Sequence, residues 1–130
     1  MTTRFQVSIF SGSFDSEARA MEYAEYHYPP EDPSAPDDEW NEDPTCPLAE
    51  AIGADFSPEY RETIWGPTRY EYLKALLVNE SDVERVREAA ADRDNVLFLI
   101  FEIDENRGLA FKHNPVGIRA CGRFHGRWEH

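Results

Sequence analysis

Two groups of side chains in this sequence have the types and spacing needed to bind a partner or a ligand. The first surrounds Trp40, in a stretch that is rich in proline and acidic residues. Indole is a frequent anchor of protein interfaces, and carboxylates around it would steer and orient a basic partner. We therefore predict that a partner binds Trp40 and its acidic neighbours Glu31, Asp32, Asp37, Asp38, Glu39, Glu42 and Asp43. The alternative is a solubilising insertion that has no partner.

The second group lies near the end of the chain, where basic side chains recur at every second position. Alternation along a strand predicts that one face carries Arg119, Cys121, Arg123, His125 and Arg127. Such a face could bind an anion, with Arg119, Arg123, His125 and Arg127 as the ligands. The alternative is a solvated face whose charges pair loosely with the acidic part of the molecule.

The patterns typical of enzymes and metal sites are not found. The chain has no Gly-x-Ser-x-Gly motif, and the turn Ser11-Gly12-Ser13 lacks the glycine pattern of a phosphate-binding loop. Cys121 and His125 do not have zinc-finger spacing, and the acidic stretch lacks the calcium-loop pattern. We therefore expect no catalytic activity, no metal and no cofactor. The two cysteines, Cys46 and Cys121, are too few for a disulfide scaffold, so we expect reduced thiols.

Charge limits the partners that this chain can have. Its 130 residues carry a net charge of −13. Residues 1–66 account for most of it, because their 15 acidic and 3 basic side chains give a net charge of −12. We therefore expect no binding to nucleic acid or to an anionic membrane, and attraction to a basic partner. The longest apolar run, Val96–Phe101, is far shorter than the ~20 residues of a membrane span, and there is no secretory signal, so we expect a cytoplasmic protein.

The first half of the chain should contain one strand, one helix and one long loop. Apolar and polar residues alternate from Arg4 to Phe10, which predicts a strand with one buried face. Asp15 or Ser16 can cap a helix whose apolar stripe runs from Phe14 to Tyr28, where two prolines end it. Residues 27–47 hold seven acids, six prolines and no Lys or Arg, which predicts an acidic, proline-rich surface loop.

The second half should contain helices followed by a small set of strands. The expected helices are Pro47–Ile52, Pro58–Trp65, Tyr70–Val78 and one opened by a capping box at Ser81 and Glu84. For Tyr70–Val78 a strand is the alternative. Residues 95–103 are apolar on both faces and should form a central strand. A tight turn at residues 105–108 should return the chain through 109–113, and residues 118–128 form a last strand. We therefore predict one α+β domain over residues 1–130. It has a mostly antiparallel sheet with helices packed on it, an N-terminal β-α unit and a C-terminal β-hairpin or meander.

Three stretches resemble the immunity protein 22 family of bacterial polymorphic-toxin systems. They are the opening strand and turn at 5–17, the run Ala54-Asp55-Phe56 ahead of Tyr60, and the apolar strand 95–104 that closes on an acid. The resemblance implies a small α+β protein that binds and neutralises a toxin encoded by a neighbouring gene. It identifies no residue-level site.

The leading hypothesis is thus a cytoplasmic immunity protein that neutralises a cognate basic toxin, such as a nuclease, by direct protein–protein contact. The composition agrees with it, because a nuclease must present positive charge to phosphate and an acidic inhibitor can cover that charge. The alternative is a small anion- or nucleotide-binding protein, or an enzyme, that uses the basic C-terminal strand.

Overall fold

The structure is a computed structural model that describes residues 2–28, 44–112 and 114–129. Its strands are β1 (Thr2–Gly12), β2 (Arg61–Trp65), β3 (Val96–Phe101) and β4 (Arg119–Glu129). Its α-helices are α1 (Glu17–Tyr23), α2 (Pro47–Ile52), α3 (Arg69–Leu76) and α4 (Glu80–Ala89), and two 3-10 turns are η2 (Pro58–Tyr60) and η3 (Asp104–Asn106). No helix in these described residues is long and apolar enough to cross a membrane.

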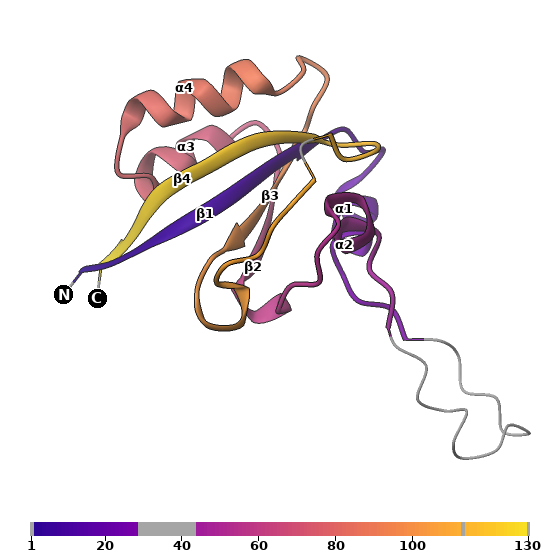
Figure 1. Ribbon diagram of the computed structural model, residues 1–130. Helices are drawn as coiled ribbons and strands as arrows, with labels where there is room; N and C mark the ends of the chain where they lie inside the picture. Colours follow the sequence, from indigo (N-terminus) through magenta and orange to yellow (C-terminus); the bar gives the residue numbers. More distant parts are fainter. Residues whose placement is uncertain (1, 29–43, 113, 130) are drawn as a thin grey trace, which may run out of the picture.

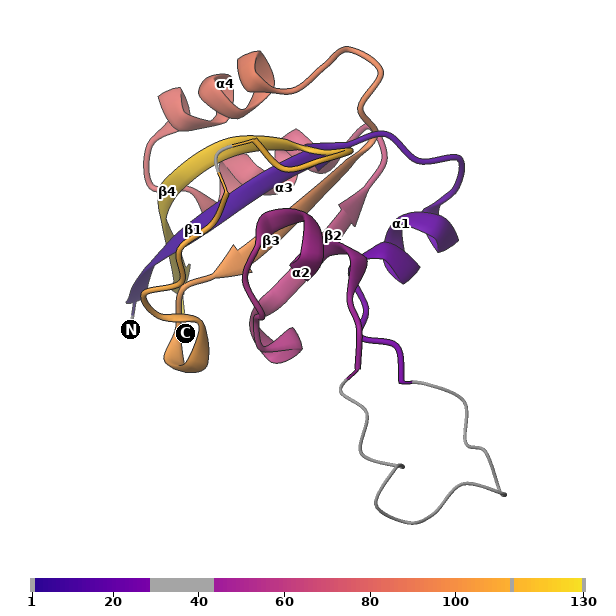
Figure 2. The ribbon, with the colours of Figure 1, turned by 45° about the vertical axis from the view of Figure 1, so that its right-hand side comes forward.

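The four strands form one antiparallel sheet in the order β2-β3-β1-β4, so the predicted α+β class is confirmed. The helices cover it on both sides. Figures 1 and 2 show α3 and α4 above the sheet and α1 and α2 below it. We call these two sides the α3/α4 face and the α1/α2 face.

The strand predicted to be central is central. β3 pairs with β1 on one side and β2 on the other, and all six of its residues are buried. Its side chains alternate between two apolar clusters. Leu97, Leu99 and Phe101 pack on the α3/α4 face, while Val96, Phe98 and Ile100 pack on the α1/α2 face.

The predicted C-terminal hairpin is wrong. β4 pairs with β1 along its length, and β1 lies between β3 and β4. After β3 the chain forms the turn η3, and residues 109–112 form no strand. The orange segment in Figure 2 instead crosses the α1/α2 face before the chain enters β4. The physical reason is that β1 already occupies the β3 edge that a hairpin would need.

The predicted helix from Pro58 to Trp65 is also wrong beyond its first turn. Pro58 starts the 3-10 turn η2, and residues 61–65 then form β2. These five residues include Thr63, Ile64 and Trp65, which favour strands. Their backbone pairs with the buried edge of β3, from Arg61 opposite Ile100 to Trp65 opposite Val96.

The remaining helices are those predicted from the sequence, and all except α2 begin or end at other residues than predicted. Helix α2 has the predicted bounds and ends at Gly53, whose φ of 77° is the left-handed conformation that glycine adopts at helix ends. Of the two candidate caps, Ser16 is the one that caps α1. The helix ends at Tyr23, and Tyr28 is therefore 75% exposed rather than part of the core stripe. Helix α4 begins at Glu80 rather than at the Ser81 capping box.

Two buried or half-buried asparagines attach loops to the sheet. Asn95 accepts a hydrogen bond from the Phe14 N–H (3.0 Å) and donates one to the Phe14 carbonyl (2.8 Å). Asn106 does the same for Ser57, at 2.6 Å and 3.2 Å. Each side-chain amide thus forms the pair of hydrogen bonds that a neighbouring strand would form. Asn95 holds the segment before α1 in place, and Asn106 holds the start of η2.

Candidate functional site

The predicted partner-binding residues lie outside the described residues. They are Glu31, Asp32, Asp37, Asp38, Glu39, Trp40, Glu42 and Asp43. We call residues 29–43 the acidic segment and use only its sequence. The structure describes the chain on both sides of it, up to Tyr28 and from Pro44.

The two flanks of the acidic segment are joined by a β-bridge, which we call the neck. The His27 N–H donates to the Thr45 carbonyl (2.7 Å), and the Thr45 N–H donates to the His27 carbonyl (2.9 Å). The next residue, Cys46, is buried in the cluster on the α1/α2 face. Its thiol donates weakly to the Tyr23 carbonyl at 3.8 Å, and burial raises the pKa of that thiol. The neck is therefore attached to the core of the molecule.

A groove of about 460 Å³ lies beside the neck. Aromatic and proline side chains and one carboxylate line it: Tyr26, Tyr28, Pro44, Asp55, Phe56 and Pro58. One wall is fixed, because the Tyr26 hydroxyl accepts a hydrogen bond from the Phe56 N–H (2.9 Å) and the two rings stand edge to face, 5.4 Å apart. Tyr28 forms the exposed wall. We call this feature the neck groove.

The chemistry of the neck groove suits a cationic side chain. Aromatic ring faces attract guanidinium and ammonium groups, and a nearby carboxylate adds an ion pair. Burial is the main influence on Tyr26 and raises the pKa of its phenol, which therefore stays neutral at physiological pH. Asp55 then supplies the charge of the groove lining.

Sequence reasoning missed the neck groove. A usable signal was present, because Tyr26 and Tyr28 precede the first prolines of the acidic segment, and Asp55, Phe56 and Pro58 repeat the same residue types farther on. Aromatic and proline residues concentrated on both sides of an acidic stretch indicate an apolar surface at its base. Their meeting depends on the neck, which no local pattern predicts.

The basic residues of β4 do not share one face, contrary to the alternation in the sequence. The β1–β4 register shifts between Ile9 and Phe10, which pair with Gly122 and Ala120 and leave Cys121 as an extra residue. Such a β-bulge reverses the alternation on one side of it. Gly122, with a φ of 126°, provides the backbone conformation that the bulge requires.

The bulge separates Arg119 from the other three candidates. Cross-strand neighbours share a face. Ser11 pairs with both Leu97 and Arg119, which puts Arg119 on the α3/α4 face. Ser8 pairs with both Ile100 and Arg123, so Arg123, His125 and Arg127 lie on the α1/α2 face.

Arg119 takes part in a cluster of polar contacts around the buried Asp94. Its Nε lies 3.5 Å from the buried Asp94 carboxylate, which also accepts hydrogen bonds from the Ser11 hydroxyl and the Ala91 N–H, both at 2.9 Å. Burial raises the pKa of the adjacent Cys121 thiol to about 12. Because only the thiolate is a strong nucleophile, Cys121 is unsuited to covalent chemistry.

Arg123 is the best-anchored of the three remaining candidates. Its Nε lies 2.8 Å from the Glu102 carboxylate, an ion pair without the alignment of a hydrogen bond, and its Nη2 donates to the Leu109 carbonyl at 2.9 Å. His125 and Arg127 are exposed and form no ion pair with the other described residues. The four predicted anion ligands therefore do not converge on one site.

The Glu102–Arg123 pair predicts a pH dependence of stability. Burial raises the pKa of the Glu102 carboxyl, and the Arg123 charge lowers it by a smaller amount. The folded protein thus holds this proton more tightly than the unfolded chain, so this group lowers stability as pH rises through the two pKa values. Relative to the wild type, Glu102→Gln should gain stability as pH rises above about 4, the ordinary range of a glutamate carboxyl. Urea unfolding of both proteins at each pH measures this, and a constant difference would contradict it.

The described residues contain no group of three or more His, Cys, Asp or Glu side chains arranged to hold a metal ion. The two cysteines are free. Cys46 lies on the α1/α2 face and Cys121 on the α3/α4 face, so the sheet separates them.

Comparison with known proteins finds no relative: no family model, curated protein or solved structure matches this chain. The resemblance to the immunity protein 22 family accordingly rests on the three stretches of sequence. One covers β1 and the approach to α1, one precedes and enters η2, and one spans β3. The first and third stretches contribute strands to the sheet. The second supplies Asp55 and Phe56 to the neck groove, whose other lining residues lie outside the three stretches.

Proposed function

We propose that this chain is an immunity protein that binds a basic partner protein, its cognate toxin, through the neck groove and the adjacent acidic segment. The observation that carries the proposal is the neck groove itself, which is lined by the exposed Tyr28, the less exposed rings of Tyr26 and Phe56, and one carboxylate. It lies next in sequence to a segment that holds seven acids and no Lys or Arg. Aromatic anchors inside a charged rim are typical of protein interfaces. The protein would act in the cytoplasm by covering the toxin, without catalysis, metal or cofactor.

Charge supports the same proposal. In the sequence the acidic segment directly follows Tyr28 and directly precedes Pro44, and both of these residues line the neck groove. A net charge of −13 attracts a basic protein before contact and favours fast association. A toxin that binds phosphate, such as a nuclease, presents the complementary positive surface.

The partner is tested by co-expression. The product of the adjacent reading frame should be toxic alone, harmless beside this protein, and recovered in complex with it. Association of the two purified proteins should slow as salt rises, because the Debye length is ~8 Å at physiological ionic strength and shortens further. Neutralising Asp37, Asp38 and Glu39 together should slow association in the same way. Rapid-mixing kinetics measure both effects, and a rate that is independent of salt would contradict electrostatic steering.

The groove is tested by removing its exposed wall. Tyr28→Ala should weaken partner binding by at least about 2 kcal/mol, the level of an interface hot spot, and change the free energy of unfolding by no more than about 0.5 kcal/mol. Trp40→Ala should do the same. Val116→Ala is the matched control, because Val116 is 86% exposed and lies away from the groove lining. Calorimetric titration measures the affinities, and normal binding by Tyr28→Ala would remove the groove from the interface.

The structure lends less support to the alternative function. An anion- or nucleotide-binding face on β4 needs its basic residues together, but the bulge turns Arg119 away and Arg123 is engaged by Glu102. Among the four predicted anion ligands, Arg123 remains a candidate for ligand binding, because it borders a cavity.

A further inference from the structure

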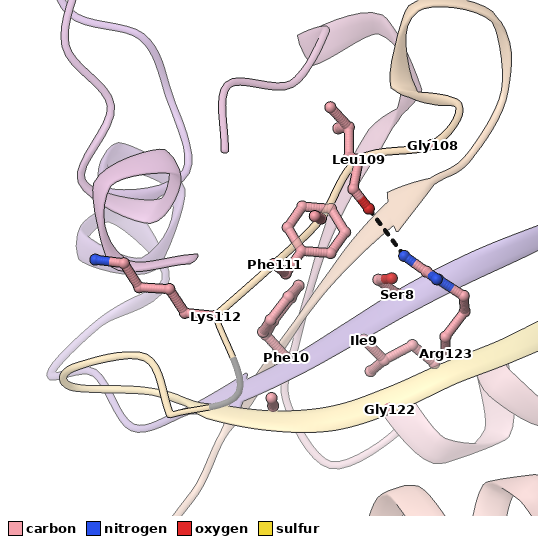
Figure 3. A pocket seen from close by; sticks show the side chains of 11 residues that line it. Ser8, Ile9, Phe10, Gly108, Leu109, Phe111, Lys112, Gly122 and Arg123 are labelled. Atoms are coloured by element: carbon pink, nitrogen blue, oxygen red, sulfur yellow. Dashed lines mark hydrogen bonds between the residues drawn. The ribbon is translucent and has the colours of Figure 1, made fainter. Parts of the chain in front are cut away.

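Arg123 borders a cavity of about 520 Å³ on the α1/α2 face of the sheet. The floor is formed by β1 and β4, and residues 108–112 pass over it. We call residues 107–112 the strap. Figure 3 shows Phe10 and Phe111 together on one side of the cavity and Arg123 reaching from β4 to the Leu109 carbonyl on the other.

The strap is held away from the sheet at both ends. Asn106, just before it, is fully buried and bound to Ser57. At its far end the Lys112 N–H donates to the Ile52 carbonyl of α2 at 2.8 Å. Both attachments are to segments on the α1/α2 side of the sheet, the start of η2 and the end of α2, and the strap pairs with neither β1 nor β4.

The β-bulge gives the cavity its room. In an unbroken register Cys121 would stand beside Phe10 on this face, but the bulge places Ala120 there and directs Cys121 to the other face. Gly122 comes next and carries no side chain. On β4 the floor of the cavity is therefore formed by two small residues, Ala120 and Gly122.

The walls of the cavity are apolar, and Arg123 is the one charged residue of the described lining whose side chain points into it. The Phe10 and Phe111 rings meet edge to face at 5.5 Å, and Leu109 closes the strap side. Lys112 also borders the cavity, but its side chain lies over Gly53 and points toward α2 (Figure 3). A guanidinium has five N–H donors, and those of Arg123 beyond its Nε and its bond to Leu109 have no partner in the described part of the chain.

We propose that this cavity binds a small molecule with an apolar, preferably aromatic, body and a single carboxylate. The body would lie against Phe10, Phe111 and Leu109, and the carboxylate would accept hydrogen bonds from the free N–H groups of Arg123. The volume is within the range of small-molecule pockets, and arginine pairs well with planar carboxylates. Glu102, already beside Arg123, disfavours a dianion such as phosphate. This site is separate from the neck groove and does not depend on the proposed partner.

The test is a titration of the full chain followed by amide NMR, with three probes: phenylpropionate, the matched alcohol phenylpropanol, and inorganic phosphate. Phenylpropionate should produce saturable shifts at Leu109, Ala120 and Gly122. The alcohol should bind about tenfold more weakly, because it lacks the charge-assisted hydrogen bonds. Phosphate should produce no saturable shift at these amides.

Two variants and a control separate the cavity from its charge. Ala120→Leu fills the cavity from an exposed position and should abolish phenylpropionate binding, whereas Val116→Leu should leave it unchanged. Arg123→Gln should remove the preference for the acid over the alcohol. Thermal unfolding shows whether each variant is folded.

Any one of the following results would overturn the proposal: no saturable shift with phenylpropionate, equal binding of acid and alcohol to the wild type, or unchanged phenylpropionate binding in a folded Ala120→Leu protein. Binding of phosphate alone would also overturn it, because a simple anion site does not need the apolar walls.

Discussion

Replacing Phe98 with alanine should lower the free energy of unfolding by about 3–5 kcal/mol, the usual cost of removing a buried aromatic ring. Phe98 is fully buried at the centre of the α1/α2 face. Its ring contacts Phe14 at 5.7 Å and Tyr23 at 5.6 Å between centroids, so it joins the sheet to α1 and the turn before it. The surrounding backbone is fixed on both sides by strand pairing and cannot collapse into the space left behind.

Phe101→Ala should have a similar effect from the other face, because Phe101 packs against Phe5 and Trp128. Urea unfolding measures both variants. Tyr28→Ala is the matched aromatic control and should stay within about 0.5 kcal/mol of the wild type, since its ring is exposed. If Phe98→Ala or Phe101→Ala unfolded as the wild type does, β3 would not be the centre of a sheet that is covered on both faces.

Asn106→Ala should cost about 2–4 kcal/mol, although it removes little apolar surface. The substitution deletes both hydrogen bonds to Ser57 and the longer one to the Tyr60 carbonyl (3.5 Å), and it leaves their backbone partners unsatisfied. Asn106→Asp should be nearly as damaging, because a carboxylate can accept from the Ser57 N–H but cannot donate to either carbonyl.

The control is Asn114→Ala, at an exposed asparagine in the loop before β4. Thermal and urea unfolding provide the stability, and amide hydrogen exchange at Ser57 and Tyr60 shows whether the loss is local. A stable Asn106→Ala protein with slow exchange at Ser57 would show that η2 is held by other contacts.

The sequence predicts those elements whose own residues are apolar enough to indicate that they are buried. β3 has apolar side chains at every position, so its central place follows from composition alone. The composition of β2 does not predict it, because the strand begins with Arg61 and Glu62 and Pro58 lies shortly before it. Its strand conformation depends on pairing with β3. The predicted C-terminal hairpin does not form for the same reason, since strand pairing between distant segments decides it. A turn at 105–108 is locally favourable, but which strand lies beside β3 is decided by β1, about ninety residues earlier.

The candidate sites divide in the same way. The acidic segment is visible in the sequence because it rests on composition, whereas the neck groove needs the backbone pairing of His27 with Thr45. The face shared by Arg119 and Arg123 disappears because a single bulge at Cys121 changes the parity of the strand. The alternation of residues gives no sign of such a bulge, although Gly122 marks a position where the backbone can depart from regular geometry.

The place of β1 in the sheet has a consequence for biosynthesis. The first strand of this chain lies between two strands that are synthesised much later, since Val7 pairs with Phe101 and Thr2 with Glu129. Folds dominated by such distant pairings form slowly, because a long loop must close before any contact rewards it. The neck groove comes from the first sixty residues, yet Phe56 and α2 beside it pack in one cluster with Phe98 and Ile100. A nascent chain therefore carries the residues of the neck groove long before β3 is available to hold Phe56 and α2 in place.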